Sequence, residues 1–266
     1  MDYKRITSGF IIGLALCVIL LSPSNIITGI LFMIVAIYAM KEYLNAISKV
    51  CKPVRWVAYA SCAIVGTINL IPDMYITKFL LLSIPTLLII LFCHVIGTDM
   101  KISFKDIAYT FFGICYVSVF LMFLTLIDKA ESGKFLLGYV FISAWGTDTM
   151  AYVIGRKYGK HKFSKVSPKK SIEGCIGGTL GALAISLIYT LIVNQVCMLG
   201  FSYLRMSLIT IVLSLIGQIG DFSASTIKRY VDIKDYSNLI PGHGGMLDRI
   251  DSVLFIAPFA YLLLVI

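Results

Sequence analysis

The stretch STIKRYVDIKDYSNLIPGHGGMLDRID, residues 225–251, decides which fold and which chemistry we expect of this chain. It gathers lysines, arginines, aspartates and a Gly-His-Gly-Gly run between two strongly apolar segments, in a chain where charged residues make up only 14%. Carboxylates bind metal ions, lysines and arginines bind phosphate, and glycines let a backbone turn its amides toward an anion. The stretch therefore predicts phosphate chemistry at the surface of a bilayer.

The composition around this stretch is that of a membrane protein. Hydrophobic residues make up 59% of the 266 residues and the mean hydropathy is +0.91, whereas soluble domains contain about 45–50% apolar residues. A water-soluble fold of this length could not bury so much apolar surface, so we expect an all-α integral membrane protein, a polytopic bundle of helices. The seven cysteines form no CxxC pair, which argues against a zinc site and a disulfide framework.

Nine apolar runs are long enough to cross a bilayer as helices. They lie at residues 7–22, 26–42, 56–72, 78–97, 104–127, 134–155, 174–197, 201–222 and 248–266. We expect residues 1–130 to form an N-terminal region of five spans and residues 131–266 a catalytic region of four spans, with cytoplasmic loops at 155–173 and 221–249. No small-residue cleavage site follows the first run, so we interpret it as a retained span and not as a signal peptide.

The basic residues predict the orientation of these spans. If the N-terminus is cytoplasmic, 19 of the 23 lysines and arginines lie on the cytoplasmic side, as the positive-inside rule requires. The four on the other side are Lys78, Lys129, Lys134 and Arg205. Nine spans then place the C-terminus outside the cell. The net charge of +9 is thus a property of the cytoplasmic face, which contacts membrane lipids, and we expect no nucleic-acid partner.

Two polar elements lie in and after the sixth span. Asp148 lies near its inner end, and a carboxylate at membrane depth is a functional candidate because it is costly to place there. The following loop contains Ser167, Lys169, Lys170 and Ser171, and Ser171 is suited to cap the next helix. A helix N-terminus flanked by lysines is a favourable seat for phosphate. The glycines that open the seventh span are interpreted as small residues for close helix packing. They are Gly174, Gly177, Gly178 and Gly181.

The third polar element begins at Asp221 and runs through the quoted stretch. If the eighth span continues as a helix past the membrane surface, Asp221, Ser225 and Lys228 share one face, and Arg229 flanks them. The start of the ninth span adds further carboxylates, where the positive end of the helix dipole favours them. Two such pieces facing each other would surround a cavity with carboxylates. Mg²⁺ suits that setting because it takes oxygen ligands and is often shared with substrate phosphates.

The run Gly-His-Gly-Gly lies three residues before the first aspartate of the ninth span. Gly244 and Gly245 give the backbone the freedom to point amide groups at an anion. His243 has three possible roles on this pattern: a contact to phosphate, packing within the loop, or acid–base chemistry. The sequence alone leaves these roles open.

The quoted stretch resembles the signature of phosphatidate cytidylyltransferases, also called CDP-diacylglycerol synthases. Every fixed position of that signature is present, from Ser225, Lys228 and Arg229 to the run that ends at Asp251. A second block resembles the same family, beginning at Asp148 and ending with Ser-Pro-Lys-Lys-Ser and Gly174. Together the two blocks cover about residues 145–251, whereas the N-terminal half is similar only as a set of apolar spans.

Three positions depart from the family pattern. Met150 stands where many members have Gly, Ser171 replaces a common Thr, and Ala224 stands where a Glu often precedes the signature serine. If that Glu helps to hold metal in relatives, this chain depends on its aspartates instead.

The resemblance implies the reaction CTP + phosphatidate → CDP-diacylglycerol + pyrophosphate, in the cell membrane of a bacterium, with the active site facing the cytoplasm. It implies Mg²⁺ as cofactor, K⁺ as a second cation, and a homodimer. The expected catalytic residues are Asp221, Lys228, Arg229, His243, Asp248 and Asp251, of which Asp221, Asp248 and Asp251 bind metal. The expected substrate-binding residues are Asp148, Ser167, Lys169, Lys170, Ser225, Gly244, Gly245 and Arg249. The resemblance does not indicate which of the basic residues bind CTP and which bind the lipid.

Three other functions were weighed against this one. A CDP-alcohol phosphotransferase would need an Asp-Gly-x₂-Ala-Arg string, which the sequence does not contain. A polyprenol or phytol kinase that uses CTP is closer in chemistry and differs in which phosphate it transfers. A transporter or lipid scramblase would place its carboxylates near the membrane midplane, whereas here they cluster toward the inner surface.

Overall fold

The computed structural model describes residues 13–14, 17–22, 24–162, 170–240, 242 and 244–266. Over these residues the chain is helical and contains no β-strand, apart from two isolated β-bridges. The prediction of an all-α fold is therefore confirmed. Half of the first expected span, residues 7–12 and 15–16, lies outside the described residues, and so do three candidate site residues: Ser167, Lys169 and His243.

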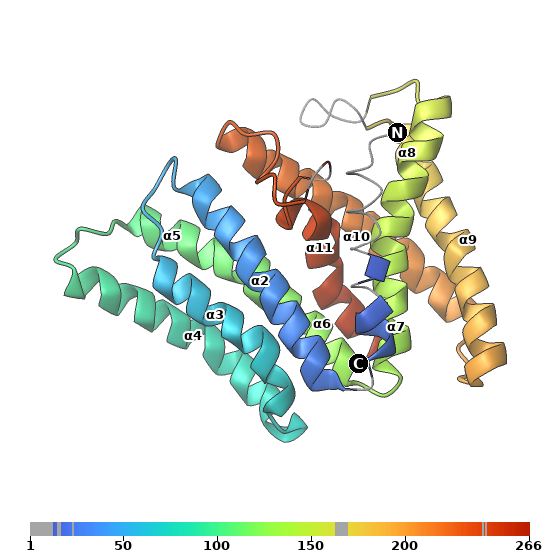
Figure 1. Cartoon of the computed structure of the whole chain (residues 1–266), viewed down its shortest axis with the longest axis horizontal. Helices are drawn as coiled ribbons and strands as arrows, with labels where there is room; N and C mark the ends of the chain where they lie inside the picture. Colours follow the sequence, from blue (N-terminus) through green and yellow to red (C-terminus); the bar gives the residue numbers. More distant parts are fainter. Residues whose placement is uncertain (1–12, 15–16, 23, 163–169, 241, 243) are drawn as a thin grey trace. The chain divides into compact units, whose positions relative to one another are not determined.

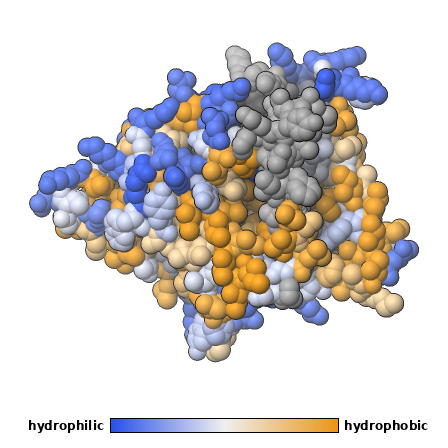
Figure 2. Space-filling model, viewed as in Figure 1, coloured by the Kyte–Doolittle hydropathy of each residue, from blue (hydrophilic) through white to orange (hydrophobic). Residues whose placement is uncertain are grey.

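Among the described residues, five helical segments are long and apolar enough to cross a membrane. They are α2 (Asn25–Ile47), α4 (Asp73–Gly97), α5 to α6 (Phe104–Lys129), α9 (Ile172–Cys197) and α10 (Tyr203–Tyr230). At 23–28 residues each, they are about 35–42 Å long, more than the roughly 30 Å of hydrocarbon in a bilayer. Apolar side chains cover much of the surface seen in Figure 2. In the most apolar 18-residue stretch of α4, only 6% of the residues are buried. The chain is a multi-pass membrane protein.

The first of two compact units contains residues 1–129 and 231–249. Besides α2 and α4, its helices are α3 (Arg55–Thr67), the 3₁₀ turn η1 (Ile68–Leu70), α5 (Phe104–Gly113), the π-helix η2 (Ile114–Val119) and α6 (Phe120–Lys129) (Figure 1). The Tyr43 hydroxyl, on α2, donates a hydrogen bond to the carbonyl oxygen of Tyr109 at 2.9 Å. Gly113 makes room for this ring, because a Cβ there would overlap it. These contacts fix α2 against α5.

Asp106 organises the N-terminus of α5 and the chain segment before α3. Its carboxylate accepts hydrogen bonds from the backbone N–H of Lys52 at 2.6 Å and of Ser103 at 2.8 Å. The Ser103 hydroxyl in turn accepts from the backbone N–H of Asp106, which completes a capping box. Asp106 is therefore a buried carboxylate with a structural role.

The second unit contains residues 130–230 and 250–266. Its helices are α7 (Gly133–Phe141), the π-helix η3 (Ile142–Gly146), α8 (Thr147–Tyr158), α9, α10 and the larger part of α11 (Leu247–Leu264). Glycines of α9 face α8 at close range: a Cβ on Gly178 would lie 2.8 Å from the carbonyl oxygen of Thr147, and one on Gly174 would lie 2.9 Å from that of Ala151. The predicted packing of α9 through small residues is confirmed.

Polar side chains connect the helices of the second unit inside its apolar packing. The Thr147 and Ser214 hydroxyls lie 2.7 Å apart, and Ser214 donates to the Thr179 hydroxyl at 3.0 Å. The amide of Gln218 donates to the same Thr179 oxygen at 3.0 Å. Such bonds hold helices together where apolar contact with lipid gives no preference for association. They fix α8, α9 and α10 as one scaffold for the site.

Candidate active site

Close packing of α10 against α11 brings two aspartates together. Gly217 and Gly220 of α10 face α11, and a Cβ built on Gly220 would lie 2.8 Å from the backbone oxygen of Asp251. Only a residue without a side chain permits this approach. Asp221 directly follows Gly220 and is thereby carried beside Asp251, close enough for the two carboxylates to repel each other electrostatically.

Asp148 joins this pair from the first turn of α8, directly after the π-helix η3. The Ser252 hydroxyl lies 3.0 Å from Asp148 Oδ2 and 3.3 Å from Asp251 Oδ1, and the Ser252 N–H donates to Asp251 Oδ1 at 2.8 Å. A hydroxyl has one hydrogen to donate, so Ser252 serves one of these carboxylates at a time. Asp148, Asp221 and Asp251 form what we call the acidic cluster.

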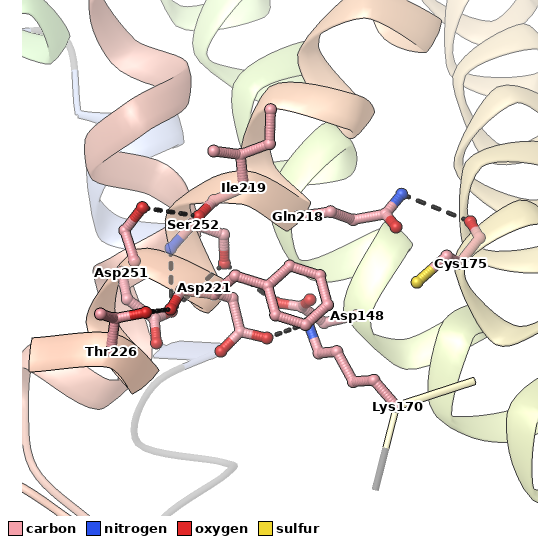
Figure 3. Close-up of polar contacts among 11 residues, drawn as sticks. Asp148, Lys170, Cys175, Gln218, Ile219, Asp221, Thr226, Asp251 and Ser252 are labelled. Carbon is pink, nitrogen blue, oxygen red and sulfur yellow. Dashed lines mark hydrogen bonds and ion pairs between the residues drawn. The ribbon is translucent and has the colours of Figure 1, made fainter. Parts of the chain in front are cut away.

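The ammonium group of Lys170 is the counter-ion of the acidic cluster. It forms an ion pair with Asp221 (Figure 3). It also lies 4.9 Å from the centre of the Phe222 ring. Burial by itself lowers the pKa of Lys170, but the negative charges of Asp221 and Asp148 outweigh burial and raise that pKa above its usual value. Lys170 therefore stays protonated at physiological pH.

Ser171 and Glu173 hold the segment that carries Lys170. Ser171 is the N-cap of α9, as predicted, and its hydroxyl accepts a hydrogen bond from the backbone N–H of Gly174 at 3.1 Å. Glu173 accepts from the backbone N–H of His161 at 3.2 Å, and its Oε1 lies 2.6 Å from His161 Nδ1. These bonds tie the segment after α8 to the start of α9, and so they place Lys170 at a helix N-terminus.

The acidic cluster contains more carboxyl groups than ammonium groups. Three carboxylates face the ammonium of Lys170, and the ammonium of Lys228 also acts electrostatically on Asp251. Among the described residues, no group of three or more His, Cys, Asp or Glu side chains is arranged to bind one metal ion. Carboxylate oxygens are nevertheless the ligands that Mg²⁺ takes, commonly one or two of them together with substrate phosphates and water. The donor set fits a cation shared with a phosphate better than a closed protein site.

An apolar cavity of about 680 Å³ lies between α9 and α10. Most of its lining is aliphatic, and Thr179 and Gln218 contribute polar groups. Phe222 lines the cavity and also lies beside the Lys170 ammonium. The cavity is therefore next to the acidic cluster within the same unit.

Asp248 organises the loop before α11 in the first unit. Its Oδ2 accepts hydrogen bonds from the backbone N–H of Tyr236 at 2.9 Å and of Gly245 at 3.0 Å. Gly244 has a φ of +82°, which favours glycine, and its carbonyl oxygen accepts from the Ile240 N–H at 2.9 Å. The sequence suggested metal binding for Asp248, and the structure adds a role in shaping this loop that the sequence pattern did not reveal.

Glu42 is a second carboxylate at this loop, and it lies outside the sequence motifs described above. It lies on α2 and accepts hydrogen bonds from the Ser237 hydroxyl at 2.5 Å, the Met246 N–H at 2.9 Å and the Leu247 N–H at 2.7 Å. One signal could have drawn attention to it: an acidic residue at the end of an apolar run, in a chain with only 14 acidic residues.

The remaining predicted residues lie on the same helices. Helix α10 runs without a break to Tyr230, so Asp221, Ser225 and Lys228 share a face as expected, and Arg229 is exposed beside them. Arg249 is half-buried in the first turn of α11. The structure thus groups some of the candidates in the second unit and others in the loop of the first unit. The former are Asp148, Lys170, Asp221 and Asp251, and the latter are Gly244, Gly245 and Asp248.

These features define a polytopic helical membrane protein in which helix ends bring carboxylates and a half-buried lysine together. Residues 3–266 match the profile of the cytidylyltransferase family. The chain belongs to this family.

Its relatives include proteins named phosphatidate cytidylyltransferase from several bacteria. It is 30% identical to the one from Staphylococcus saprophyticus over 266 residues, which is 100% of this chain and 99% of the relative. It is 31% identical to the one from Staphylococcus aureus strain COL, with the same coverage of both chains. It is 38% identical to the one from Bacillus subtilis over 165 residues, which is 62% of this chain and 58% of the relative.

Proposed function

We propose that this chain is a phosphatidate cytidylyltransferase, which transfers the cytidylyl group of CTP to phosphatidate and releases pyrophosphate. The observation that carries the proposal is the acidic cluster, with Lys170 as its counter-ion, next to an apolar cavity. A soluble nucleotide and a membrane-held lipid can both reach a site made of helix ends. Family membership and the names of the relatives support the same activity.

The reaction needs alignment and charge compensation more than covalent chemistry. A phosphate oxygen of the lipid attacks the α-phosphorus of CTP while the bond to pyrophosphate breaks. Both reactants are anions, so the site must hold them in line and offset their repulsion. Lys170 brings a protonated ammonium group to that position, and Lys228 and Arg229 of the same unit supply further positive charge. The attacking phosphate is already ionised, and the reaction therefore requires no strong general base.

A divalent cation fits the acidic cluster. Asp148, Asp221 and Asp251 offer three carboxyl groups of the second unit as ligands. Metal binding by Asp248 stays a prediction from the sequence. When bound, Mg²⁺ would offset the charge of the reacting phosphates and polarise the phosphoryl group under attack. One of these carboxylates, Asp221, also orients Lys170 through their ion pair. That K⁺ is a second cation and that the protein forms a homodimer are predictions from the family resemblance.

The apolar cavity is the place that we assign to an acyl chain of phosphatidate. Its aliphatic lining suits a hydrocarbon chain, and its volume of about 680 Å³ is in the usual range of ligand cavities. Because Phe222 borders both the cavity and Lys170, a chain in the cavity would leave the lipid phosphate near the ammonium group.

We also propose that the chain crosses the membrane nine times and that its N-terminus is cytoplasmic. Beyond the five apolar helices, the continuous helical stretch of residues 133–158 and the 18 residues of α11 are about 39 Å and 27 Å long at 1.5 Å per residue. The distribution of lysines and arginines supports a cytoplasmic site. A site on that side receives CTP directly from the cytoplasm.

The position of the label in CTP tests the proposed function. Purified protein with phosphatidate and Mg²⁺ should transfer label from α-labelled CTP into lipid and none from γ-labelled CTP. Transfer of γ-label into lipid would instead identify a lipid kinase. Movement of lipid or ions across liposomes without any consumption of CTP would identify a transporter.

A further inference from the structure

Glu42 lies far in sequence from the residues that define the family signature, yet its carboxylate is bound to them. It is 5% exposed and lies in the C-terminal part of α2. Three donors converge on it: the Ser237 hydroxyl and the backbone N–H groups of Met246 and Leu247. A buried carboxylate in an apolar helix is costly unless hydrogen bonds compensate for the lost water. These three bonds provide that compensation.

The position of Glu42 explains how α11 begins. The first N–H groups of a helix have no partner within the helix, and a side-chain oxygen just before it usually accepts from them. Here the residue before α11 is Met246, whose side chain has no oxygen. Glu42 supplies the missing acceptor from α2, and its negative charge suits the positive end of the helix dipole. Gly245 makes this contact possible, because a Cβ there would lie 2.5 Å from Glu42 Oε2.

The same turn of α11 carries the residues of the reaction. Asp248 lies one residue after Leu247, and Asp251 of the acidic cluster follows one helical turn later. Any rotation or shift of the first turn therefore moves both carboxylates. Displacement of a catalytic group by about 1 Å can lower a rate about 100-fold.

We propose that Glu42 is a positioning residue for cytidylyl transfer. It fixes the first turn of α11, and with it Asp248 and Asp251, by accepting hydrogen bonds from Ser237, Met246 and Leu247. Glu42 itself contacts no substrate in this account. The inference rests on the proposed function. Cytidylyl transfer by the wild-type protein is therefore measured in parallel. A wild type without this activity would overturn the proposed function, whereas with an active wild type the variants decide the role of Glu42.

The test compares Glu42→Gln with Asp106→Asn. Gln keeps the size of the side chain but replaces one accepting oxygen with an NH₂ donor that faces N–H groups. Asp106 is the matched control, because it is also buried (6% exposed) and also accepts backbone hydrogen bonds, but at α5. Both variants are purified in detergent, and thermal unfolding, kcat and KM for CTP are measured below the unfolding temperature of each.

For Glu42→Gln we expect kcat to fall at least about tenfold, with KM for CTP within about threefold of the wild-type value. This pattern is expected when a substitution weakens stabilisation of the transition state and leaves substrate binding unchanged. For Asp106→Asn we expect a lower unfolding temperature with kcat within about threefold of the wild type. An unchanged kcat in Glu42→Gln would overturn the inference. Equal losses in both variants, in proportion to the loss of folded protein, would also overturn it, because Glu42 would then be structural only.

A second variant decides the case if Glu42→Gln does not fold. Ser237→Ala removes one donor and leaves the Glu42 carboxylate with its two backbone partners. We expect this protein to fold and to lose kcat by about threefold or more, again with little change in KM for CTP. Wild-type kcat in Ser237→Ala would count against the positioning role.

Discussion

Asp221→Asn is expected to lower turnover by roughly 10³-fold or more, the scale of losing a group that stabilises transition-state charge. Asp221 is the carboxylate paired with Lys170, and its charge acts on Asp251 as well. The substitution keeps the size of the side chain and removes its charge, so the ion pair with Lys170 is lost together with a proposed metal ligand. Incorporation of α-labelled CTP into lipid by the purified variant measures the effect.

Lys52→Ala is the control for Asp221→Asn. Lys52 is exposed, and the sequence assigns it only to the orientation of the spans. We expect this variant to retain nearly full turnover. If Asp221→Asn kept turnover close to that of the wild type, or if Lys52→Ala lost as much, the assignment of Asp221 to the active site would be wrong.

Asp248→Asn should also abolish turnover, and this substitution separates two roles of the side chain. In the structure Oδ2 of Asp248 accepts hydrogen bonds from the backbone N–H groups of Tyr236 and Gly245. The carbonyl oxygen of Asn can take its place and keep the loop. The negative charge, which metal binding requires, is lost. We therefore expect folded protein with turnover lowered by roughly 10³-fold.

The alternative outcome for Asp248→Asn is equally informative. Turnover within about tenfold of the wild type would mean that Asp248 serves the loop alone. The thermal unfolding temperature is the control: it should stay near that of the wild type in Asp248→Asn and fall in Asp248→Ala, which removes the accepting oxygen as well.

Local patterns in the sequence predicted much of the second unit. Ser171 was expected to cap a helix because a serine before an apolar run has a hydroxyl for the free N–H groups, and it does so. The glycines of α9 were expected to pack closely, and they do. Asp148, Asp221 and Asp251 were selected because carboxylates are rare and costly beside a membrane, and the structure places them together with Lys170.

Contacts between distant segments could not be predicted in the same way. Glu42 is 195 residues from Ser237 and 205 from Leu247, and no periodicity links positions so far apart. The π-helix η3 ends two residues before Asp148, and its residues belong to an apolar run in which nothing indicates a wider turn. The loop role of Asp248 depends on the path of the chain from Tyr236 to Gly245, which residue types alone do not determine.

Binding of Mn²⁺ to the purified protein, followed by electron paramagnetic resonance, most directly tests whether the acidic cluster is a cation site. We expect Mn²⁺ to bind the wild-type protein and to bind Asp251→Asn at least about tenfold more weakly, because the acidic cluster loses a carboxyl ligand. Equal Mn²⁺ affinity in the wild type and in Asp251→Asn, with both proteins folded, would contradict the assignment of the acidic cluster as the cation site of the enzyme.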